Sequence, residues 1–377
     1  MGLRTNRMNL IRVVPAEGLR PPRAFSRQPG RSLTRSQRCC DIMKNHSLLC
    51  GLALLGLAAF SHADSSADAK TPTLTVYTYD SFASDWGPGP KIKEAFEAQC
   101  GCTLSFVATD SSTGILSRVQ LEGGNSPADI VLGLDATQLS DARATGLLSP
   151  HGVDTAALEL PVDWQDDTFV PFDYGYFSFI YDSSKLDQVP ASLDELAASD
   201  LKIIIQDPRS STPGLGLLLW VQAAKGEQAA NYWPELADNV VTVTKGWSEA
   251  YGLFLEGESD MVLSYTTSPA YHMIAESKDQ YRAAAFSDGH GIQIEVAAKL
   301  ASAPQAALAD QFMAFILSDS FQSVIPTGNW MYPVTAVPTP DEFSRLVEVG
   351  NSLTIDADSV HDNKKTWLRA FNRGISQ

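Results

Sequence analysis

The chain has 377 residues and a mass of 40.8 kDa, with 44% hydrophobic and 19% charged residues. These values are typical of a soluble globular protein with room for two or three domains or one large bilobal unit. Residues 1–63 hold ten basic and two acidic side chains, so residues 64–377 carry a formal net charge of −24. Such an acidic surface repels phosphate backbones and anionic lipid headgroups, which disfavours nucleic-acid and peripheral-membrane functions and weakly favours a cationic ligand.

The N-terminal region contains the three parts of a secretory signal peptide. One lysine precedes an apolar run from Leu48 to Phe60, and a small-residue Ser-His-Ala site ends at residue 63. The run is shorter than the roughly 20 residues that a membrane-spanning helix needs. We therefore expect residues 43–63 to be a signal peptide and the mature chain to begin at Asp64, in the periplasm. Residues 1–42 are interpreted as an extension from a start codon assigned too early.

Two cysteines, Cys100 and Cys102, remain after the signal peptide. In an oxidising compartment they could close a very small disulfide ring, which the flexibility of Gly101 favours. The alternatives are two inert thiols, or a chemical role as metal ligands or as a nucleophile. A zinc site would need a second Cys/His pair, which the spacing does not supply. The disulfide is the interpretation that we favour.

The segment from residue 74 to residue 145 alternates strand and helix patterns. Period-two or continuous apolar runs predict strands, and apolar residues three or four positions apart predict helices. The predicted strands span 74–79, 104–108 and 129–133, and the predicted helices span 90–100, 115–121 and 137–145. This alternation is typical of a parallel sheet with helices on both faces.

The stretch over 169–181 is long, aromatic and extended, which predicts a crossover strand between two lobes. A second α/β run follows, with helices predicted over 193–198, 214–225 and 249–255 and strands over 202–206, 240–243 and 261–264. An apolar strand over 291–297 crosses back, and an amphipathic helix spans 305–317. We therefore predict an α/β fold of two lobes with a ligand cleft between them. Lobe one would comprise 73–171 and 284–318, and lobe two 172–283 and 319–377.

The chain lacks the common signatures of enzymes. It contains no Gly-x-Ser-x-Gly elbow, no Walker Gly-Lys-Ser/Thr and no His-Glu-x-x-His. Four histidines follow the signal peptide, at positions 151, 272, 290 and 361, and they are scattered without ligand spacing. A lone histidine is more often a surface or hydrogen-bonded core group than a catalytic one. We expect no enzymatic activity, no metal site and no cofactor.

Aromatic residues cluster beside Gly, Pro, Ser and Thr, in segments predicted to be loops at strand ends. They are Tyr77, Tyr79, Phe82, Trp86, Trp247, Tyr251, Tyr265, Tyr271, Trp330 and Tyr332. Each ring alone fits a core position, since aromatics carry much of the buried area of any domain. As a group beside Asp80, Asp85 and Asp110, they indicate a rim that binds a flat organic cation.

A second polar cluster spans residues 210–216 and reads Ser-Ser-Thr-Pro-Gly-Leu-Gly before an apolar helix. An ordinary helix start, with a hydroxyl cap and proline in the first turn, explains most of this pattern. Free backbone N–H groups flanked by three hydroxyls would also bind a hydroxyl or phosphate group. Both interpretations remain open at this point.

Six segments resemble, in order, those of the periplasmic thiamine-binding proteins of ABC importers. They are TVYTYDSFASDWGPGP, TFVPFDYGYF, QDPRSSTPGLGLLLW, VTVTKGWSEAYGLFL, GESDMVLSYTTSPAYH and IPTGNWMYP, which together cover most of residues 74–334. The resemblance implies a type II periplasmic-binding-protein fold and a monomer without a cofactor. It implies thiamine, thiamine monophosphate and thiamine diphosphate as ligands, and an inner-membrane permease with its ATPase as partners.

The resemblance also implies a set of binding residues. The ring contacts would be Tyr79, Trp86, Trp247, Tyr265, Tyr271 and Trp330. Ser211 and Thr212 would contact the hydroxyethyl or phosphate end, with Thr266, Thr267 and Ser268 as further polar contacts. Where the family has an acidic residue followed by glycine, residues 109–114 read Thr-Asp-Ser-Ser-Thr-Gly, so Asp110 and Ser111 complete the set.

Two other functions fit the same fold. A thiaminase-like transferase would attack the methylene bridge of thiamine with the thiolate of Cys100 or Cys102. A ferric-ion-binding protein typically uses adjacent tyrosines, and this chain has no Tyr-Tyr pair.

Overall fold

The first lobe is built on three parallel strands. The computed structural model describes residues 71–376, so the predicted extension, signal peptide and mature N-terminus lie outside the described residues. Strand β1 (Thr73–Tyr79) lies between β2 (Thr103–Thr109) and β3 (Ile130–Asp135), and it runs parallel to both. The connections contain α1 (Asp80–Ala83), α2 (Gly89–Cys100), α3 (Ser112–Glu122), η1 (Gly123–Asn125), η2 (Ala136–Gln138) and α4 (Leu139–Arg143).

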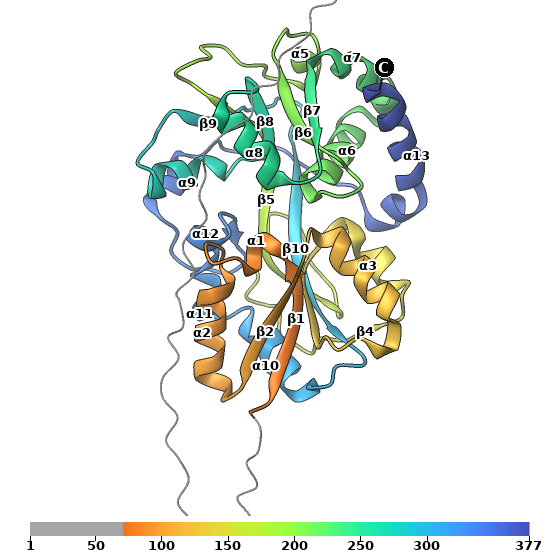
Figure 1. The fold of residues 1–377 in the computed structure, drawn as a ribbon, viewed down its shortest axis with the longest axis vertical. Coiled ribbons are helices and arrows are strands. Elements are labelled where there is room, and N and C mark those ends of the chain that lie inside the picture. The colour runs from red at the N-terminus through yellow and green to blue at the C-terminus, as the bar shows by residue number, and fades with distance from the viewer. Residues whose placement is uncertain (1–70, 377) are drawn as a thin grey trace, which may run out of the picture. The chain divides into compact units, whose positions relative to one another are not determined.

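Two long strands, β5 (Phe169–Asp182) and β10 (His290–Leu300), join the lobes. They pair with each other in antiparallel fashion, and β10 also runs antiparallel to β3. The far end of β5 pairs with β8 (Met261–Tyr265) of the second lobe. Figure 1 shows both strands passing from one group of strands to the other. The expected parallel pairing therefore holds within each lobe, and the joining strands, for which no direction was predicted, enter the sheet antiparallel to their neighbours.

The second lobe repeats the parallel arrangement. Strand β6 (Ile203–Gln206) runs parallel to β7 (Val240–Thr244) and to β8, which gives the sheet order β2-β1-β3-β10-β5-β8-β6-β7. Its helices are α5 (Leu193–Ala197), α6 (Thr212–Lys225), α7 (Ala229–Leu236), α8 (Trp247–Glu256) and α9 (Ser268–Ala275), with turns η3 (Gly226–Gln228) and η4 (Ala237–Asn239). Short strands β4 (Leu148–Ser149) and β9 (Tyr281–Ala283) pair with β10 and β5.

Each lobe has an apolar core on both faces of its sheet, because alternate side chains of a strand point to opposite faces. In β1, Leu74 and Val76 belong to one core and Tyr77 to the other. In β6, Ile203 and Ile205 face one core and Ile204 the other. The described residues fall within one compact unit.

The chain after β10 packs on both lobes. It forms α10 (Ala306–Phe315), α11 (Asp319–Gln322), α12 (Ile325–Gly328), β11 (Tyr332–Pro333), η5 (Asp341–Arg345), β12 (Ser352–Leu353) and α13 (Ala357–Ile375). Phe321, Ile325 and Met331 lie in the same core as Leu74, which differs from the predicted boundary at residue 319. Helix α13 buries Val360 and Phe371 in the core of the second lobe.

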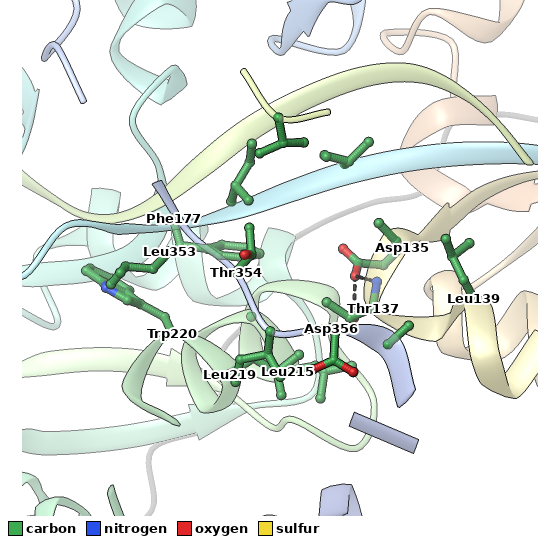
Figure 2. Close-up of a pocket in the computed structure, with 18 of the residues that line it drawn as sticks. Asp135, Thr137, Leu139, Phe177, Leu215, Leu219, Trp220, Leu353, Thr354 and Asp356 are labelled. Carbon is green, nitrogen blue, oxygen red and sulfur yellow. Dashed lines mark hydrogen bonds between the residues drawn. The ribbon is translucent and has the colours of Figure 1, made fainter. Parts of the chain in front are cut away.

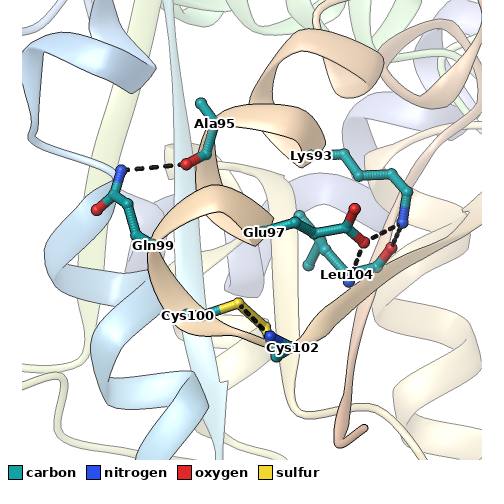
Figure 3. Close-up of a disulfide and its surroundings, with 7 residues drawn as sticks. All are labelled: Lys93, Ala95, Glu97, Gln99, Cys100, Cys102 and Leu104. Atoms are coloured by element: carbon teal, nitrogen blue, oxygen red, sulfur yellow. Dashed lines mark hydrogen bonds and ion pairs between the residues drawn. A yellow bond between two sulfur atoms is a disulfide. The ribbon is translucent and has the colours of Figure 1, made fainter.

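Cys100 and Cys102 form a disulfide where α2 turns into β2 (Figure 3). Gly101 between them has a φ of 59°, a left-handed conformation that glycine adopts without steric cost. Next to the turn, Glu97 pairs with Lys93 and accepts a hydrogen bond from the backbone N–H of Leu104. The disulfide leaves neither cysteine as a free thiol.

Candidate ligand-binding site

The predicted ligand contacts lie mostly where parallel strands end. Tyr79 is the last residue of β1 and Tyr265 the last residue of β8, while Ser111 caps the helix after β2 and Ser211 the helix after β6. Trp247 opens α8, directly after β7. In open α/β sheets, the carboxyl ends of the strands form the edge where ligands bind.

The two lobes touch at this edge through polar side chains. The hydroxyl of Ser112, at the start of α3, lies 2.9 Å from the hydroxyl of Thr212, at the start of α6. Asp110 forms an ion pair with Lys245, which follows β7. Both members of that ion pair are largely exposed, so water and salt screen it. The N-terminal ends of α3 and α6 therefore lie next to each other across the lobes.

Ser111 and Ser211 occupy equivalent caps but use their hydroxyls differently. Ser111 Oγ accepts a hydrogen bond from the N–H of Gly114, as a helix cap does. Ser211 is only 3% exposed, and its Oγ has no hydrogen-bond partner among the described residues. The fully buried hydroxyls of Thr266 and Thr267 share this property. Because buried polar groups are normally hydrogen-bonded, these three hydroxyls favour contact with a polar ligand.

Ring contacts connect the aromatic residues of the second lobe in one series, which runs from Trp247 through Tyr251 and His272 to Tyr271. Tyr271 in α9 and Trp330 after α12 meet edge to face, with ring centroids 5.3 Å apart. Trp247 donates its indole N–H to Ser264, which in turn lies 2.7 Å from the hydroxyl of Ser268. Trp86 is not part of this series, since it follows α1 and is 60% exposed.

Several aromatic residues that were predicted to lie in loops belong to the core. Tyr77 and Phe82 are fully buried, and Tyr251 is buried in α8. The segment around Tyr271 is helix α9, and Trp247 lies within a helix instead of before it. Pattern alone could not separate these residues, because a ring beside Gly or Ser packs equally well against a core.

Sequence reasoning missed a buried polar network formed by Tyr79, Asp173, Glu295 and Asn329. Tyr79 donates its hydroxyl proton to Glu295 in β10 at 2.6 Å, and Asn329 donates to Asp173 in β5 at 2.6 Å. Asn329 Nδ2 also lies 2.9 Å from the hydroxyl of Tyr79. The only sequence signal is that a carboxylate lies inside each of two long, mostly buried strands.

The network extends to the second lobe. Tyr265 donates its hydroxyl proton to Gln293 Oε1 at 2.7 Å, and Gln293 Nε2 donates to Glu295 at 3.0 Å. Burial raises the pKa of the Tyr79 and Tyr265 hydroxyls well above the usual range, and the negative charge of Glu295 raises both further. Both tyrosines therefore remain protonated donors at physiological pH.

A cavity of about 340 Å³ lies beside β10, lined by η2, α6 and the segment over 353–357 (Figure 2). Its walls include Phe177, Leu215 and Trp220, and Asp135 brings a carboxylate to its edge. Burial raises the pKa of Asp135 to about 6. Of the predicted ligand contacts, only Thr212 lines this cavity. The cavity is therefore separate from the aromatic groups described above.

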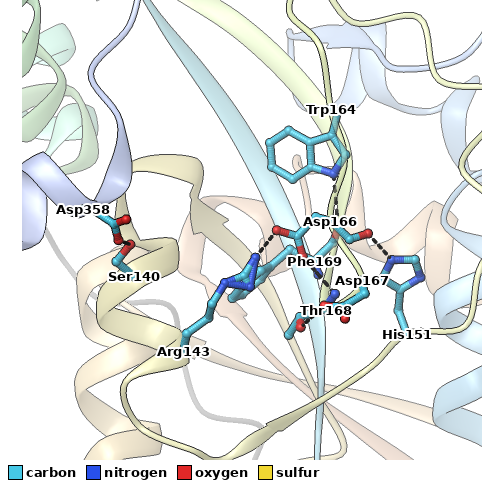
Figure 4. Close-up of polar contacts among 9 residues, drawn as sticks. All are labelled: Ser140, Arg143, His151, Trp164, Asp166, Asp167, Thr168, Phe169 and Asp358. Carbon is cyan, nitrogen blue, oxygen red and sulfur yellow. Dashed lines mark hydrogen bonds and ion pairs between the residues drawn. The ribbon is translucent and has the colours of Figure 1, made fainter.

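The four histidines in the described part of the chain are all held by protein partners. His151 lies between the carbonyl of Asp166 and the N–H of Val153, beside the Arg143–Asp166 ion pair (Figure 4). The others contact Tyr251 and Glu276 (His272), Phe177 and Phe286 (His290), and Asp141 (His361). Burial lowers the pKa of His272 and of His290, which favours their neutral forms. These contacts are structural in character.

Two further findings concern residues 71–376. No three His, Cys, Asp or Glu side chains gather there in a way that could hold a metal ion. None of the helices in that range is long and apolar enough to cross a membrane.

Comparison with known proteins gives concordant matches. Residues 78–323 match the model of a family described as bacterial extracellular solute-binding proteins. The thiamine-binding periplasmic protein of Escherichia coli (strain K12) is 54% identical over 308 residues, which is 81% of this chain and 94% of that protein. A solved structure of a periplasmic thiamin binding protein has 53% identity and a TM-score of 0.80, covering 81% of this chain and 97% of the other. Iron-bound HitA from Pseudomonas aeruginosa has 20% identity and a TM-score of 0.65, covering 80% of this chain and 99% of the other, and shows the fold alone.

Proposed function

Because the chain belongs to the family of bacterial extracellular solute-binding proteins, we propose that it captures thiamine in the periplasm and delivers it to an ABC importer. Its relatives named as thiamine-binding periplasmic proteins support this ligand. The observation that carries the assignment is the buried, unpartnered hydroxyl of Ser211 at the edge where the two lobes meet. The edge-to-face pair of Tyr271 and Trp330 supplies an aromatic surface.

The two ends of thiamine require different contacts. The cationic thiazolium and the aminopyrimidine are flat rings, which aromatic faces bind through stacking and cation–π attraction. Tyr79, Trp86, Trp247, Tyr265, Tyr271 and Trp330 form the proposed ring contacts. The hydroxyethyl end, or a phosphate attached to it, would meet the start of α6 at Ser211 and Thr212, where free N–H groups and the helix dipole favour an anion. Asp110, Ser111, Thr266, Thr267 and Ser268 complete the proposed set.

The proposed protein is a binding protein and not an enzyme. A thiaminase-like reaction needs a thiolate, and the disulfide occupies Cys100 and Cys102. Relatives that are 54% and 49% identical are binding proteins by name. A ferric-ion function is supported only by the shared fold, since the iron-bound neighbour is 20% identical.

Titration calorimetry of the mature chain tests this function directly. We expect thiamine to bind one site per chain and to be recovered unchanged by mass spectrometry. Thiamine monophosphate and thiamine diphosphate should bind the same site and compete with thiamine. Recovery of cleaved thiamine would support the transferase instead, and tight binding of Fe³⁺ without thiamine binding would support the ferric alternative.

The proposal extends to the cellular context. We propose that the chain acts as a monomer and that its partners are an inner-membrane permease and an ATPase. Light scattering of the ligand-bound protein should give the mass of one mature chain. In membranes containing the permease, the loaded protein should stimulate ATP hydrolysis, and failure to do so would argue against delivery to that permease.

A further inference from the structure

Two carboxyl groups face each other at the point where the joining strands meet. Asp173 in β5 and Glu295 in β10 are direct partners in the antiparallel register. Asp173 is 0% exposed and Glu295 5% exposed, and Asn329 Nδ2 lies within hydrogen-bond distance of both carboxyl groups, 2.6 Å from Asp173 and 3.2 Å from Glu295. No ion pair within residues 71–376 neutralises either of them. Two carboxylates this close and this buried do not both ionise, because their like charges repel in a medium of low dielectric constant.

The surroundings of the pair are neutral or acidic on every side. Tyr79 from β1 and Asn329 after α12 donate to it, and Gln293 connects it to Tyr265 of β8. The remaining titratable neighbour is Asp135, the strand partner of Glu295 in β3. One oxygen of Asp173 has no hydrogen-bond partner among the described residues. No positively charged group among these neighbours compensates the negative charge of the pair. A cationic ligand could supply that positive charge.

The pair is also connected to the proposed ring contacts of both lobes. Tyr79 and Tyr265 hydrogen-bond into the network, and Asn329 directly precedes Trp330. We propose that Asp173 and Glu295 share one proton in the free protein and act as the counter-charge for the cationic ring of the ligand, releasing that proton when the ligand binds. This inference rests on the proposed function, since it requires a cationic ligand beside these tyrosines.

The proton balance is simple. In the free protein the pair carries one negative charge, as one carboxylic acid and one carboxylate with Asn329 between them. A bound thiazolium lowers the free energy of the doubly ionised pair, so the shared proton moves to solvent and no covalent bond changes. Burial raises the pKa of both carboxyls above the ordinary range, which keeps the shared proton in place at neutral pH before binding.

Calorimetry in buffers of different ionisation enthalpy measures the protons released. For wild-type protein and thiamine at pH 7, we expect release of up to about one proton, and tighter binding as the pH rises. Glu295→Gln should still bind thiamine but release no proton, and its affinity should become nearly independent of pH. Its preference for thiamine over deazathiamine, a neutral isostere, should fall by at least about tenfold.

Matched variants assign the proton to the pair. Glu122→Gln is the control, because Glu122 also accepts a hydrogen bond from a β1 tyrosine, Tyr77, but an ion pair with Arg118 neutralises it; it should behave as wild type. Loss of proton release in Asp135→Asn but not in Glu295→Gln would overturn the proposal. Should Glu295→Gln not fold, wild-type thiamine binding without proton release or pH dependence would overturn it equally. Absence of thiamine binding by the wild type would instead refute the proposed function itself.

Discussion

Ser111 and Ser211 are two helix caps in the same molecule that use their hydroxyl groups differently. The first hydroxyl accepts from its own helix, and the second is buried without a protein partner. The same residue type at the same cap position therefore serves two roles. It caps the helix at α3 and, as proposed, contacts the ligand at α6. Because Ser111 also belongs to the proposed ligand-binding set, it serves as the reference for helix capping alone when Ser211 is tested.

Replacing Ser211 by Ala should weaken the binding of thiamine monophosphate by about 1–2 kcal/mol and the binding of thiamine by less. The reason is that a hydrogen bond to a charged phosphate is stronger than one to a neutral hydroxyl. The stability of this variant should change little, whereas Ser111→Ala should lower the free energy of unfolding by about 1 kcal/mol through loss of the cap. Titrations of each variant with both ligands, together with urea unfolding, separate these effects. If Ser211→Ala weakens both ligands equally, or neither, the phosphate end is bound elsewhere.

Trp330 has an unusual backbone for its side chain. Its φ of 56° lies in the left-handed region, where a residue other than glycine costs roughly 1 kcal/mol or more. A bulky indole held there at an energetic cost, beside Tyr271, is consistent with a role in binding.

We therefore expect Trp330→Ala and Trp330→Gly to lose the same thiamine affinity, about 1–3 kcal/mol, by removing ring stacking and cation–π attraction. The glycine variant should be the more stable of the two by about 0.5–1 kcal/mol, since glycine adopts a positive φ without strain. Calorimetry gives the affinities and thermal unfolding the stabilities. An alanine variant as stable as the glycine variant would show that the left-handed backbone relaxes on truncation.

The residues of the candidate site divide into those that sequence reveals and those that it does not. Trp330 and Ser211 stand beside glycine and proline, so their segments are recognisable. Asp173 and Glu295 become neighbours only through the pairing of β5 with β10. No local pattern encodes that register, because it depends on how the whole sheet assembles.

At the level of elements, helix α13 connects parts of the molecule that are distant in sequence. On one side Phe371 packs against Trp233 of α7, with ring centroids 4.9 Å apart. On the other side Lys364 donates to Asp141 of α4 at 2.5 Å, and His361 pairs with the same carboxylate. These contacts lower the pKa of Asp141 and keep it ionised.

Truncating Phe371 should therefore destabilise the protein through α13. We expect Phe371→Ala to lower the free energy of unfolding by about 3–5 kcal/mol, since it removes a buried ring from a closely packed core. Leu121→Ala is a suitable control, because Leu121 is 89% exposed and should change stability by less than about 0.5 kcal/mol. Denaturant unfolding measures both, and equal stabilities would mean that α13 adds nothing to the core.

Helices and strands with a strong period were predictable, and their ends less so. The predicted helix over 214–225 begins two residues earlier, at Thr212, because the polar cap residues carry no apolar period. Helix α9 was predicted as loop, since its proline and serine also begin turns. Helix α13 was not predicted because it is mostly polar and buries only a narrow face.

For the whole molecule, the decisive feature is the pairing of β3 with β10. The first lobe contains the first three strands, yet its sheet is completed by a strand that follows the entire second lobe. A fragment covering residues 64–283 should therefore fail to form the first lobe, even though it contains β1, β2 and β3. Near-UV circular dichroism and proteolysis of that fragment test this, and a protease-resistant first lobe would contradict it.

This dependence on the last strands has a consequence for biogenesis. A nascent chain cannot close its first lobe until β10 has left the ribosome, so most of the polypeptide remains without its final partners during synthesis. If the N-terminal leader directs export as proposed, a chain that folds late stays threadable through a narrow translocation channel. The interleaved order of strands would then couple the completion of folding to arrival on the far side of the membrane.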